Sequence, residues 1–200
     1  MLLRSDGTEI HIVENDAVGT EKDPALLFIH GAGGDASIWD FQAAYFRGIH
    51  LVFRLDLPGH GGSGPEGEEE IGAYAHRVRS VIQRRLSSVP LVLVGHSMGG
   101  AIVQELALDP PGNIEGLVLV GTGAKLGVMP AVFDMLREDP EGFFRTIDAA
   151  AFHPDTPREI RDPIIDGIRR CPPPVIFKDF AACNRFDIRD RLSGVRLPTF

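Results

Sequence analysis

The sequence predicts an α/β fold in which helices cover both faces of a mostly parallel sheet. Two observations lead to this fold class. Short continuous runs of Val, Leu, Ile and Phe recur along the first 120 residues, as expected of strands that are buried on both faces. Segments whose apolar residues have helical spacing separate these runs, and such alternation is typical of a parallel sheet.

The strands are expected in a regular order along the chain. Residues 8–14 alternate between apolar and polar side chains after a turn at 5–7, which indicates an antiparallel hairpin or edge strand. Four buried strands are expected to follow, at 25–29, 50–55, 91–94 and 114–120.

Helices are expected between these strands. Asp35 or Ser37 can cap the first helix, whose inner face is expected to carry Trp39 and Phe41. The other two helices are expected at 70–86 and 98–108. Two prolines at 110 and 111 end the last of them.

The pattern changes after Gly123. Prolines divide residues 125–186 into short helical pieces that are rich in Phe and show no convincing core strand. A helical insertion after the C-terminal end of a strand is suited to form a lid over the ligand-binding edge of the sheet. We therefore expect a core at 1–123, a helical cap at 124–187 and an incomplete return to the core at 188–200.

The stretch that points to chemistry is Gly95-His96-Ser97-Met98-Gly99, between a buried strand and a helix. Its two glycines leave room for the strained backbone that a sharp strand-to-helix turn imposes on the serine. The serine hydroxyl then stands above the sheet, at the positive end of a helix dipole. This context predicts a nucleophile at Ser97, and the alternative is a Gly-rich turn that happens to contain a serine.

Two further loops complete a recognisable order of motifs. His30-Gly31-Ala32-Gly33-Gly34 follows the first buried strand, and Asp56-Leu57-Pro58-Gly59-His60-Gly61-Gly62-Ser63 follows the second. With Trp39, the serine pentapeptide and a helical segment after the strand at 114–120, these motifs resemble the α/β-hydrolase family over essentially the whole chain. The resemblance implies that family's fold with a helical cap.

The resemblance also implies roles for individual residues. Ser97 would attack an acyl carbon to form a covalent intermediate, and the backbone N–H groups of Ala32 and Met98 would bind the oxyanion. Asp56 and His60 resemble a structural turn of the family. The supporting residues would be His30, Gly31, Gly33, Gly95 and Gly99, with His30 bracing its loop rather than transferring protons.

The substrate class follows from the nucleophile and from the Phe-rich cap. A serine points to esters, thioesters, lactones, amides or activated C–C bonds, and we expect a carboxylesterase that acts on a small, partly apolar molecule. The residues expected to line its pocket are Trp39, Phe133, Phe144 and Phe152. No metal or organic cofactor is implied, since the nucleophile and oxyanion hole need none.

A serine also needs a base and a carboxylate that orients the base. In the family that the chain resembles, both usually follow the next core strand, and residues 197–200 look like the start of that strand. We therefore expect both groups beyond Phe200, in a chain cut short before its last core strands. His153 with Asp155 is the alternative pair within the chain. Two functions stay open: a serine hydrolase cut short, and a non-catalytic protein that binds a small apolar ligand.

The remaining expectations concern partners and compartment. The net charge of −8 disfavours nucleic acid and anionic membranes as partners, and no apolar run approaches the length of a membrane span. The N-terminus lacks the plan of a signal peptide and the two cysteines follow no metal spacing, so the cytoplasm is the expected compartment. Without a covering strand, residues 114–120 form an apolar edge, through which we expect self-association.

Overall fold

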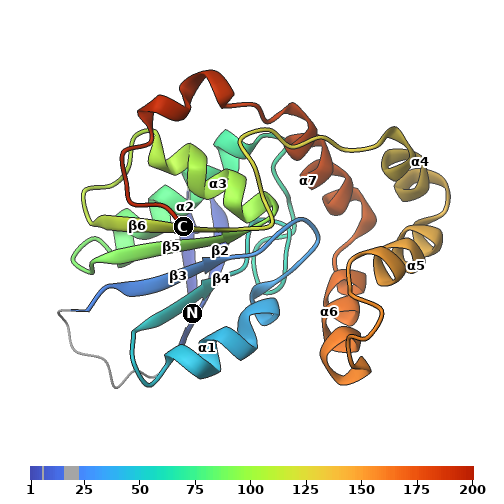
Figure 1. The fold of residues 1–200 in the computed structure, drawn as a ribbon, viewed down its shortest axis with the longest axis horizontal. Coiled ribbons are helices and arrows are strands. Elements are labelled where there is room, and N and C mark those ends of the chain that lie inside the picture. Colours follow the sequence, from blue (N-terminus) through green and yellow to red (C-terminus); the bar gives the residue numbers. More distant parts are fainter. Residues whose placement is uncertain (6, 16–22) are drawn as a thin grey trace.

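The computed structural model describes residues 1–5, 7–15 and 23–200, which build one six-stranded sheet in the order β1-β2-β4-β3-β5-β6 (Figure 1). The strands are β1 Leu2–Ser5, β2 Thr8–Asn15, β3 Ala25–Ile29, β4 Val52–Leu55, β5 Leu91–His96 and β6 Ile114–Val120. The pairs formed among β3, β4, β5 and β6 are parallel, whereas β1 and β2 join the sheet in antiparallel fashion. The predicted mostly parallel sheet is therefore confirmed.

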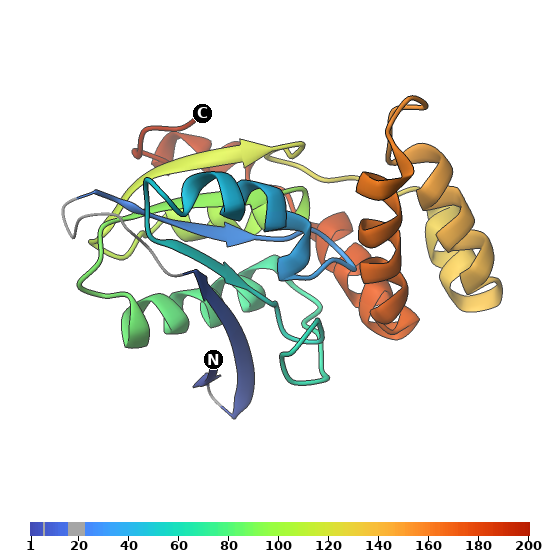
Figure 2. The same cartoon turned by 90° about the horizontal axis from the view of Figure 1, so that it is seen from below.

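Helices cover both faces of this sheet, as Figures 1 and 2 show. Helices α2 (Ile71–Arg85) and α3 (Met98–Ala107) lie on one face, and α1 (Asp40–Phe46) lies on the other. Strand β3 displays both environments in alternate side chains, because Leu27 packs into the core under α2 and α3 while Phe28 packs into the core under α1. A strand buried on both faces is apolar throughout, which is why β3 lacks a polar alternation.

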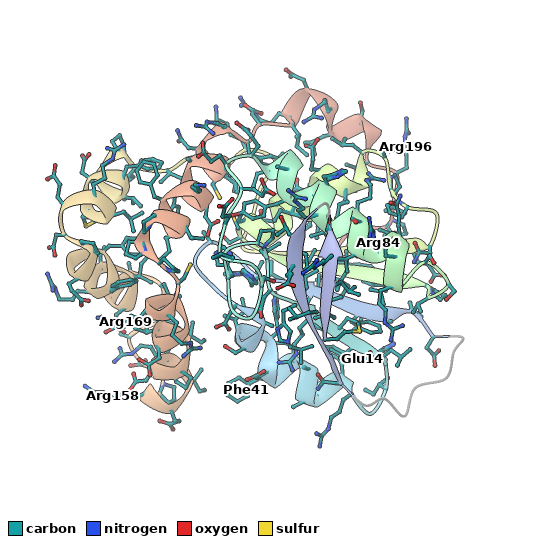
Figure 3. The ribbon with its side chains drawn as sticks, turned by 180° about the vertical axis from the view of Figure 1, so that it is seen from behind. Glu14, Phe41, Arg84, Arg158, Arg169 and Arg196 are labelled. Atoms are coloured by element: carbon teal, nitrogen blue, oxygen red, sulfur yellow. The ribbon has the colours of Figure 1, made fainter. Side chains whose placement is uncertain are left out.

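Helix α1 differs from the expected one in which side chains it buries. A 3₁₀ helix, Ala36–Trp39, precedes α1, and Asp35 caps it by accepting a hydrogen bond from the Ser37 amide at 2.9 Å. Because a 3₁₀ turn has three residues instead of 3.6, the buried face shifts in phase. Trp39 is 5% exposed but Phe41 is 63% exposed and projects away from the sheet (Figure 3). The prediction that Phe41 faces the core is wrong.

A group of four helices lies beyond the C-terminal ends of the parallel strands (Figure 2). These helices are α4 Pro130–Glu138, α5 Pro140–Ala150, α6 Arg158–Arg170 and α7 Pro173–Arg185. Prolines begin three of them, because the first helical position requires no N–H donor and suits the fixed φ of proline. Among the described residues, no helix combines the length and the apolar content that crossing a membrane requires.

The chain enters and leaves the helical group at adjacent points. The Ile188 amide donates to the Ala124 carbonyl at 2.8 Å, and Lys125 and Asp187 form an isolated antiparallel bridge. The helices also share their own apolar cluster, of which Phe143, Val175 and Ile176 are buried members. The division into core, cap and return stays a prediction, and the paired segments lie where that division places its boundaries.

The edge at β6 differs from the open edge that the sequence analysis expects. After a short 3₁₀ helix, Arg189–Gly194, residues 198–200 run alongside β6. The Leu117 and Leu119 amides donate to the carbonyls of Pro198 and Phe200 at 2.9 and 2.8 Å, so part of the edge already has backbone partners. Self-association through residues 114–120 stays a prediction.

Candidate active site

The turn between β5 and α3 places Ser97 in a strained conformation. Its φ of 52° and ψ of −116° make it the single non-glycine residue with positive φ in the described part of the chain. Such a conformation costs about 1–3 kcal/mol and persists only where the surrounding structure enforces it. A Cβ atom at Gly95 would lie 2.4 Å from the Gly99 carbonyl oxygen, and one at Gly99 would lie 2.3 Å from the Ile29 carbonyl oxygen. Both positions therefore require glycine for the turn to close.

Loop 30–34, which follows β3, passes directly beside this serine. A Cβ atom at Gly31 would lie 3.1 Å from the Ser97 Cβ atom, so a side chain there would crowd the hydroxyl group. Gly33 has φ of +68°, a conformation that other residues adopt only with strain. The glycines of the loop thus allow its backbone to approach Ser97 closely.

The peptide group between Gly31 and Ala32 is held from its carbonyl side. The Gly31 oxygen accepts hydrogen bonds from His30 Nδ1 at 2.8 Å and from the Gly34 amide at 3.1 Å. Because the peptide is trans, the Ala32 N–H points the opposite way from that oxygen. The Met98 N–H, in the first turn of α3, has no partner within the helix. Over the described ranges neither amide has a hydrogen-bond acceptor, so both are free to bind one.

His30 braces this loop as a neutral imidazole. It is fully buried, and its Nε2 accepts from the Leu57 amide at 3.0 Å while its Nδ1 donates to Gly31. Burial, reinforced by the nearby His60, lowers the pKa of His30 to about 4. A histidine with both nitrogens engaged in this way is suited to hold the loop and not to exchange protons.

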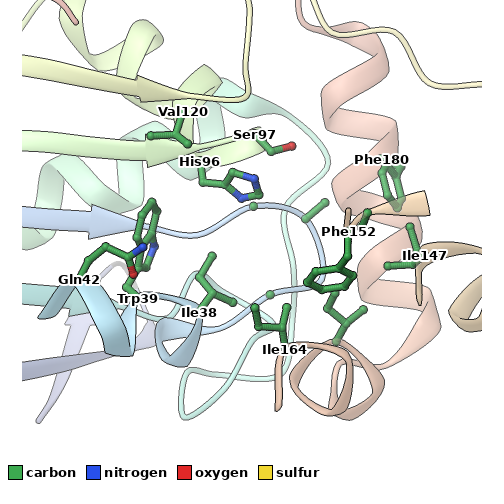
Figure 4. Close-up of a pocket in the computed structure, with 15 residues that line it drawn as sticks. Ile38, Trp39, Gln42, His96, Ser97, Val120, Ile147, Phe152, Ile164 and Phe180 are labelled. Carbon is green, nitrogen blue, oxygen red and sulfur yellow. The ribbon is translucent and has the colours of Figure 1, made fainter. Parts of the chain in front are cut away.

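A cavity of about 470 Å³ opens in front of Ser97 (Figure 4). The core contributes its floor, and helices α5, α6 and α7 contribute the opposite wall. Its lining residues are Gly31, Ala32, Gly34, Ile38, Trp39, Gln42, His96, Ser97, Val120, Ile147, Ala151, Phe152, Ile164, Ile168 and Phe180. No Lys, Arg, Asp or Glu is among these fifteen residues. The cavity is therefore suited to an uncharged, largely apolar molecule.

The structure separates the four residues that the sequence analysis assigns to the pocket. Trp39 and Phe152 line the cavity with Ser97, whereas Phe133 and Phe144 do not. The Phe133 ring packs against that of Phe177 at 5.2 Å, and the Arg169 guanidinium covers the Phe144 ring at 5.0 Å. Both serve the packing of the helical group, because an amphipathic helix buries its large aromatic side chains against neighbouring helices.

Several lining residues escape the sequence analysis. Ile164 and Ile168 on α6 have the i, i+4 spacing of one helix face. This spacing can be read from the sequence, but it does not reveal what the helix face contacts. His96, next to the predicted nucleophile, also lines the cavity. Its ring meets that of Trp39 edge to face at 6.3 Å, and burial lowers its pKa.

The described residues provide no base for Ser97. The Ser97 hydroxyl has no hydrogen-bond partner in this part of the chain. His153 and Asp155 lie 3.7 Å apart on the surface with side chains 76% and 92% exposed, and neither lines the cavity. Asp56 accepts from the Ala36 and Gly62 amides, as expected of a structural turn. Nor do the described ranges bring three or more His, Cys, Asp or Glu together as a metal site.

Comparison with known proteins provides independent evidence. Residues 24–163 match the sequence model of the family described as alpha/beta hydrolase fold. The chain is 37% identical to human monoglyceride lipase over 128 residues, which cover 60% of this chain and 41% of the lipase. It is 28% identical over 190 residues to 3-oxoadipate enol-lactonase 2 of Acinetobacter baylyi, covering 90% of this chain and 70% of the lactonase.

Solved structures show the same architecture. An esterase from Exiguobacterium antarcticum superimposes with a TM-score of 0.88 at 18% identity, over 97% of this chain and 76% of the esterase chain. Several curated relatives are much longer than the segment they share, since the match spans only 25% to 41% of their length. The family match covers residues 24–163, which is more than half of the chain. The chain belongs to the alpha/beta hydrolase fold family.

Proposed function

We propose that this protein is a serine hydrolase that cleaves a carboxylic ester or a related acyl bond through an acyl-enzyme on Ser97. One observation carries the proposal: a serine in a strained turn lies beside two backbone N–H groups that have no other acceptor among the described residues. Strain of this kind is retained where it serves a function. A Gly-rich turn that contained serine by chance would not need the close approach of Gly31.

The proposed reaction proceeds in two steps. The Ser97 oxygen attacks the acyl carbon, and the carbonyl oxygen takes up negative charge, which the Ala32 and Met98 N–H groups stabilise. The bond between the acyl carbon and the alcohol oxygen then breaks, and the alcohol leaves with the proton that the base took from the Ser97 hydroxyl. Water hydrolyses the acyl-enzyme to the free acid and restores the serine. A preorganised donor of this type contributes about 3–4 kcal/mol of transition-state stabilisation. The base and its carboxylate, which the sequence analysis expects after Phe200, are part of the proposal.

The substrate is proposed to be small to medium in size and uncharged near the scissile bond. The cavity of about 470 Å³ is walled by isoleucine, valine, alanine and phenylalanine, and Gln42 and His96 add its polar side chains besides Ser97. The names of relatives include a monoglyceride lipase and an enol-lactonase. An apolar acyl ester suits this lining better than a substrate with an added carboxylate, because none of the lining side chains is a cation.

A fluorophosphonate probe tests the proposal. We expect stoichiometric labelling of the protein, and loss of labelling in Ser97→Ala. Ser87→Ala is the matched control, because Ser87 is exposed and lies outside the cavity. The same assay on the chain extended by the downstream coding sequence shows whether the expected base and carboxylate increase the labelling rate. Absence of labelling in both folded forms would contradict a hydrolase.

The second candidate is a non-catalytic protein that binds a small apolar molecule in the same cavity. The observation that favours it is the Ser97 hydroxyl without a hydrogen-bond partner in the described ranges. Trp39 is the only tryptophan of the sequence and lines the cavity, so its fluorescence reports binding directly. Saturable quenching by an apolar ester that is recovered unhydrolysed supports this candidate.

A further inference from the structure

Asp179 is a buried carboxylate that the proposed chemistry does not use. It lies in the middle of α7, is 0% exposed, and accepts hydrogen bonds from three separate parts of the core. Tyr74 of α2 donates to Oδ1 at 2.6 Å, whereas His60 Nε2 and the Gly33 amide both donate to Oδ2 at 2.8 Å. A fully buried carboxylate in a helix is costly unless its partners compensate it, so this cluster needs an explanation.

The charge on Asp179 is balanced by His60. Both ring nitrogens of His60 face acceptors, since Nδ1 donates to the Pro58 carbonyl at 2.9 Å and Nε2 donates to Asp179. An imidazole that donates from both nitrogens is a cation. Burial alone would lower the pKa of His60, but the Asp179 carboxylate outweighs that effect and holds the pKa well above its ordinary value. The result is a buried ion pair that links α7 to the turn after β4.

The third contact of Asp179 reaches the loop beside Ser97. The peptide before Ala32 is held by His30 and Gly34 through the Gly31 carbonyl, as described above. The peptide after Ala32 ends in the Gly33 N–H, and this group binds Asp179. One flanking peptide is thus fixed from within the core and the other from the helical group. The Ala32 N–H lies between these two attachments.

We propose that Asp179 is a positioning residue, which orients the Ala32 N–H toward the oxyanion by anchoring the Gly33 amide to α7. This inference rests on the proposed function, because the direction of the Ala32 N–H matters only if that group binds the oxyanion. Asp179 touches no reacting atom and acts through loop 30–34. Gly33 also lies against α6 and α7, since a Cβ atom there would meet Ile176 at 3.3 Å and Ile168 at 3.5 Å. Removing the anchor therefore leaves the loop in contact with the helices and held at the Gly31 carbonyl, but without its restraint at the Gly33 amide.

Three variants of this cluster separate positioning from stability. Asp179→Ala removes the acceptor of Gly33, and Asp179→Asn leaves an acceptor oxygen without the charge that keeps His60 protonated. Tyr74→Phe is the matched control, because it removes the hydrogen bond to Oδ1 of the same carboxylate and leaves the Gly33 contact at Oδ2 in place. All three variants are expected to lower the Tm. A loss of activity caused by lower stability alone would therefore appear in all three, whereas a loss of positioning would appear only in the two Asp179 variants.

The readouts are hydrogen exchange at the Gly33 amide and the kinetics of ester hydrolysis. For Asp179→Ala we expect faster Gly33 exchange and a kcat about 100-fold lower, with KM changed less than about twofold, since misaiming one donor resembles losing it. For Asp179→Asn we expect about a tenfold loss of kcat in the same pattern, and for Tyr74→Phe no change in kcat or in Gly33 exchange. If Asp179→Ala does not fold, Asp179→Asn carries the comparison.

Wild-type kcat and wild-type Gly33 exchange in Asp179→Ala, or in Asp179→Asn if the alanine variant does not fold, would overturn the inference. Equal losses of kcat in Asp179→Asn and Tyr74→Phe would do the same, because the effect would then follow stability alone. Wild-type protein that neither hydrolyses esters nor reacts with a fluorophosphonate refutes the proposed function instead. In that case Gly33 exchange decides the inference: selective loss of protection in the Asp179 variants supports the anchor, and unchanged protection overturns it.

Discussion

The two walls of the cavity are built on different principles. On the core side, loop 30–34 and the Ser97 turn present backbone groups. Their geometry depends on glycines at positions where a side chain would crowd neighbouring atoms. On the helical side, α5, α6 and α7 present apolar side chains such as Ile147, Ile164 and Phe180. Changes in loop 30–34 and in the Ser97 turn should therefore act through backbone geometry, and changes on the helical side through shape and packing.

The largest effect is expected from adding one methyl group on the core side. Gly99→Ala places a Cβ atom 2.3 Å from the Ile29 carbonyl oxygen, a backbone atom that cannot move aside. We expect a loss of at least about 4 kcal/mol in the free energy of unfolding, measured by urea denaturation, or failure to fold. Gly127→Ala is the control, since a Cβ atom there meets nothing within 4 Å. A stable Gly99→Ala protein would show that the turn can open.

Two phenylalanines distinguish lining from packing on the helical side. Phe144→Ala removes a side chain that is 5% exposed and outside the cavity, so we expect a loss of about 3–5 kcal/mol in stability and unchanged ligand affinity. Phe152→Ala alters a partly exposed residue that lines the cavity. We therefore expect a higher KM or weaker ligand quenching of Trp39 fluorescence, with a smaller loss of stability than in Phe144→Ala. The opposite pattern would place Phe144 at the ligand.

The core side should also respond to acid through His30. Its pKa falls from an ordinary value near 6.5 to about 4 in the folded protein, because of burial first and of His60 second. Protons therefore bind the unfolded chain more readily, and as pH falls from about 6.5 to 4 the protein should lose about 3 kcal/mol of stability.

Urea denaturation across that range measures this loss. His30→Asn should be less stable than wild type at pH 7, with a difference that narrows toward pH 4 because the variant lacks the titrating group. His153→Gln is the control on an exposed histidine, and we expect it to follow the wild-type curve. If the free energy of unfolding of wild type and of His30→Asn differed by the same amount at all pH values, His30 would not be the group that destabilises the protein in acid.

The smallest effect concerns a thiol beside the Asp179 cluster. Burial, and then the Asp179 carboxylate, raise the pKa of Cys183 to about 12. We expect Cys183 to resist iodoacetamide at pH 8 in the native protein and to react fully in urea, as read by mass spectrometry. Faster native labelling in Asp179→Asn than in wild type would follow from loss of the charge, and rapid labelling of the wild type would show that α7 opens readily.

More of the core than of the helical group could be predicted from the sequence. The strands, the serine turn and loop 30–34 are encoded locally, because strand burial and glycine turns leave periodic or positional signals in neighbouring residues. Phe41 is an exception even there, since a 3₁₀ turn before α1 rotates the helix face that meets the sheet. In the helical group the same Phe-rich composition serves both lining and packing, and it does not separate Phe152 from Phe144.

The sequence by itself determined the family, the mostly parallel sheet and the placement of Ser97 between a strand and a helix. These follow from short-range patterns and from motif order. Only the tertiary structure decided which side chains line the cavity, that residues 198–200 pair with β6, and that Asp179 reaches Gly33 across 146 positions of the chain. Such contacts depend on how separate elements pack, and a carboxylate in the middle of a helix carries no local sign of the distant amide it binds.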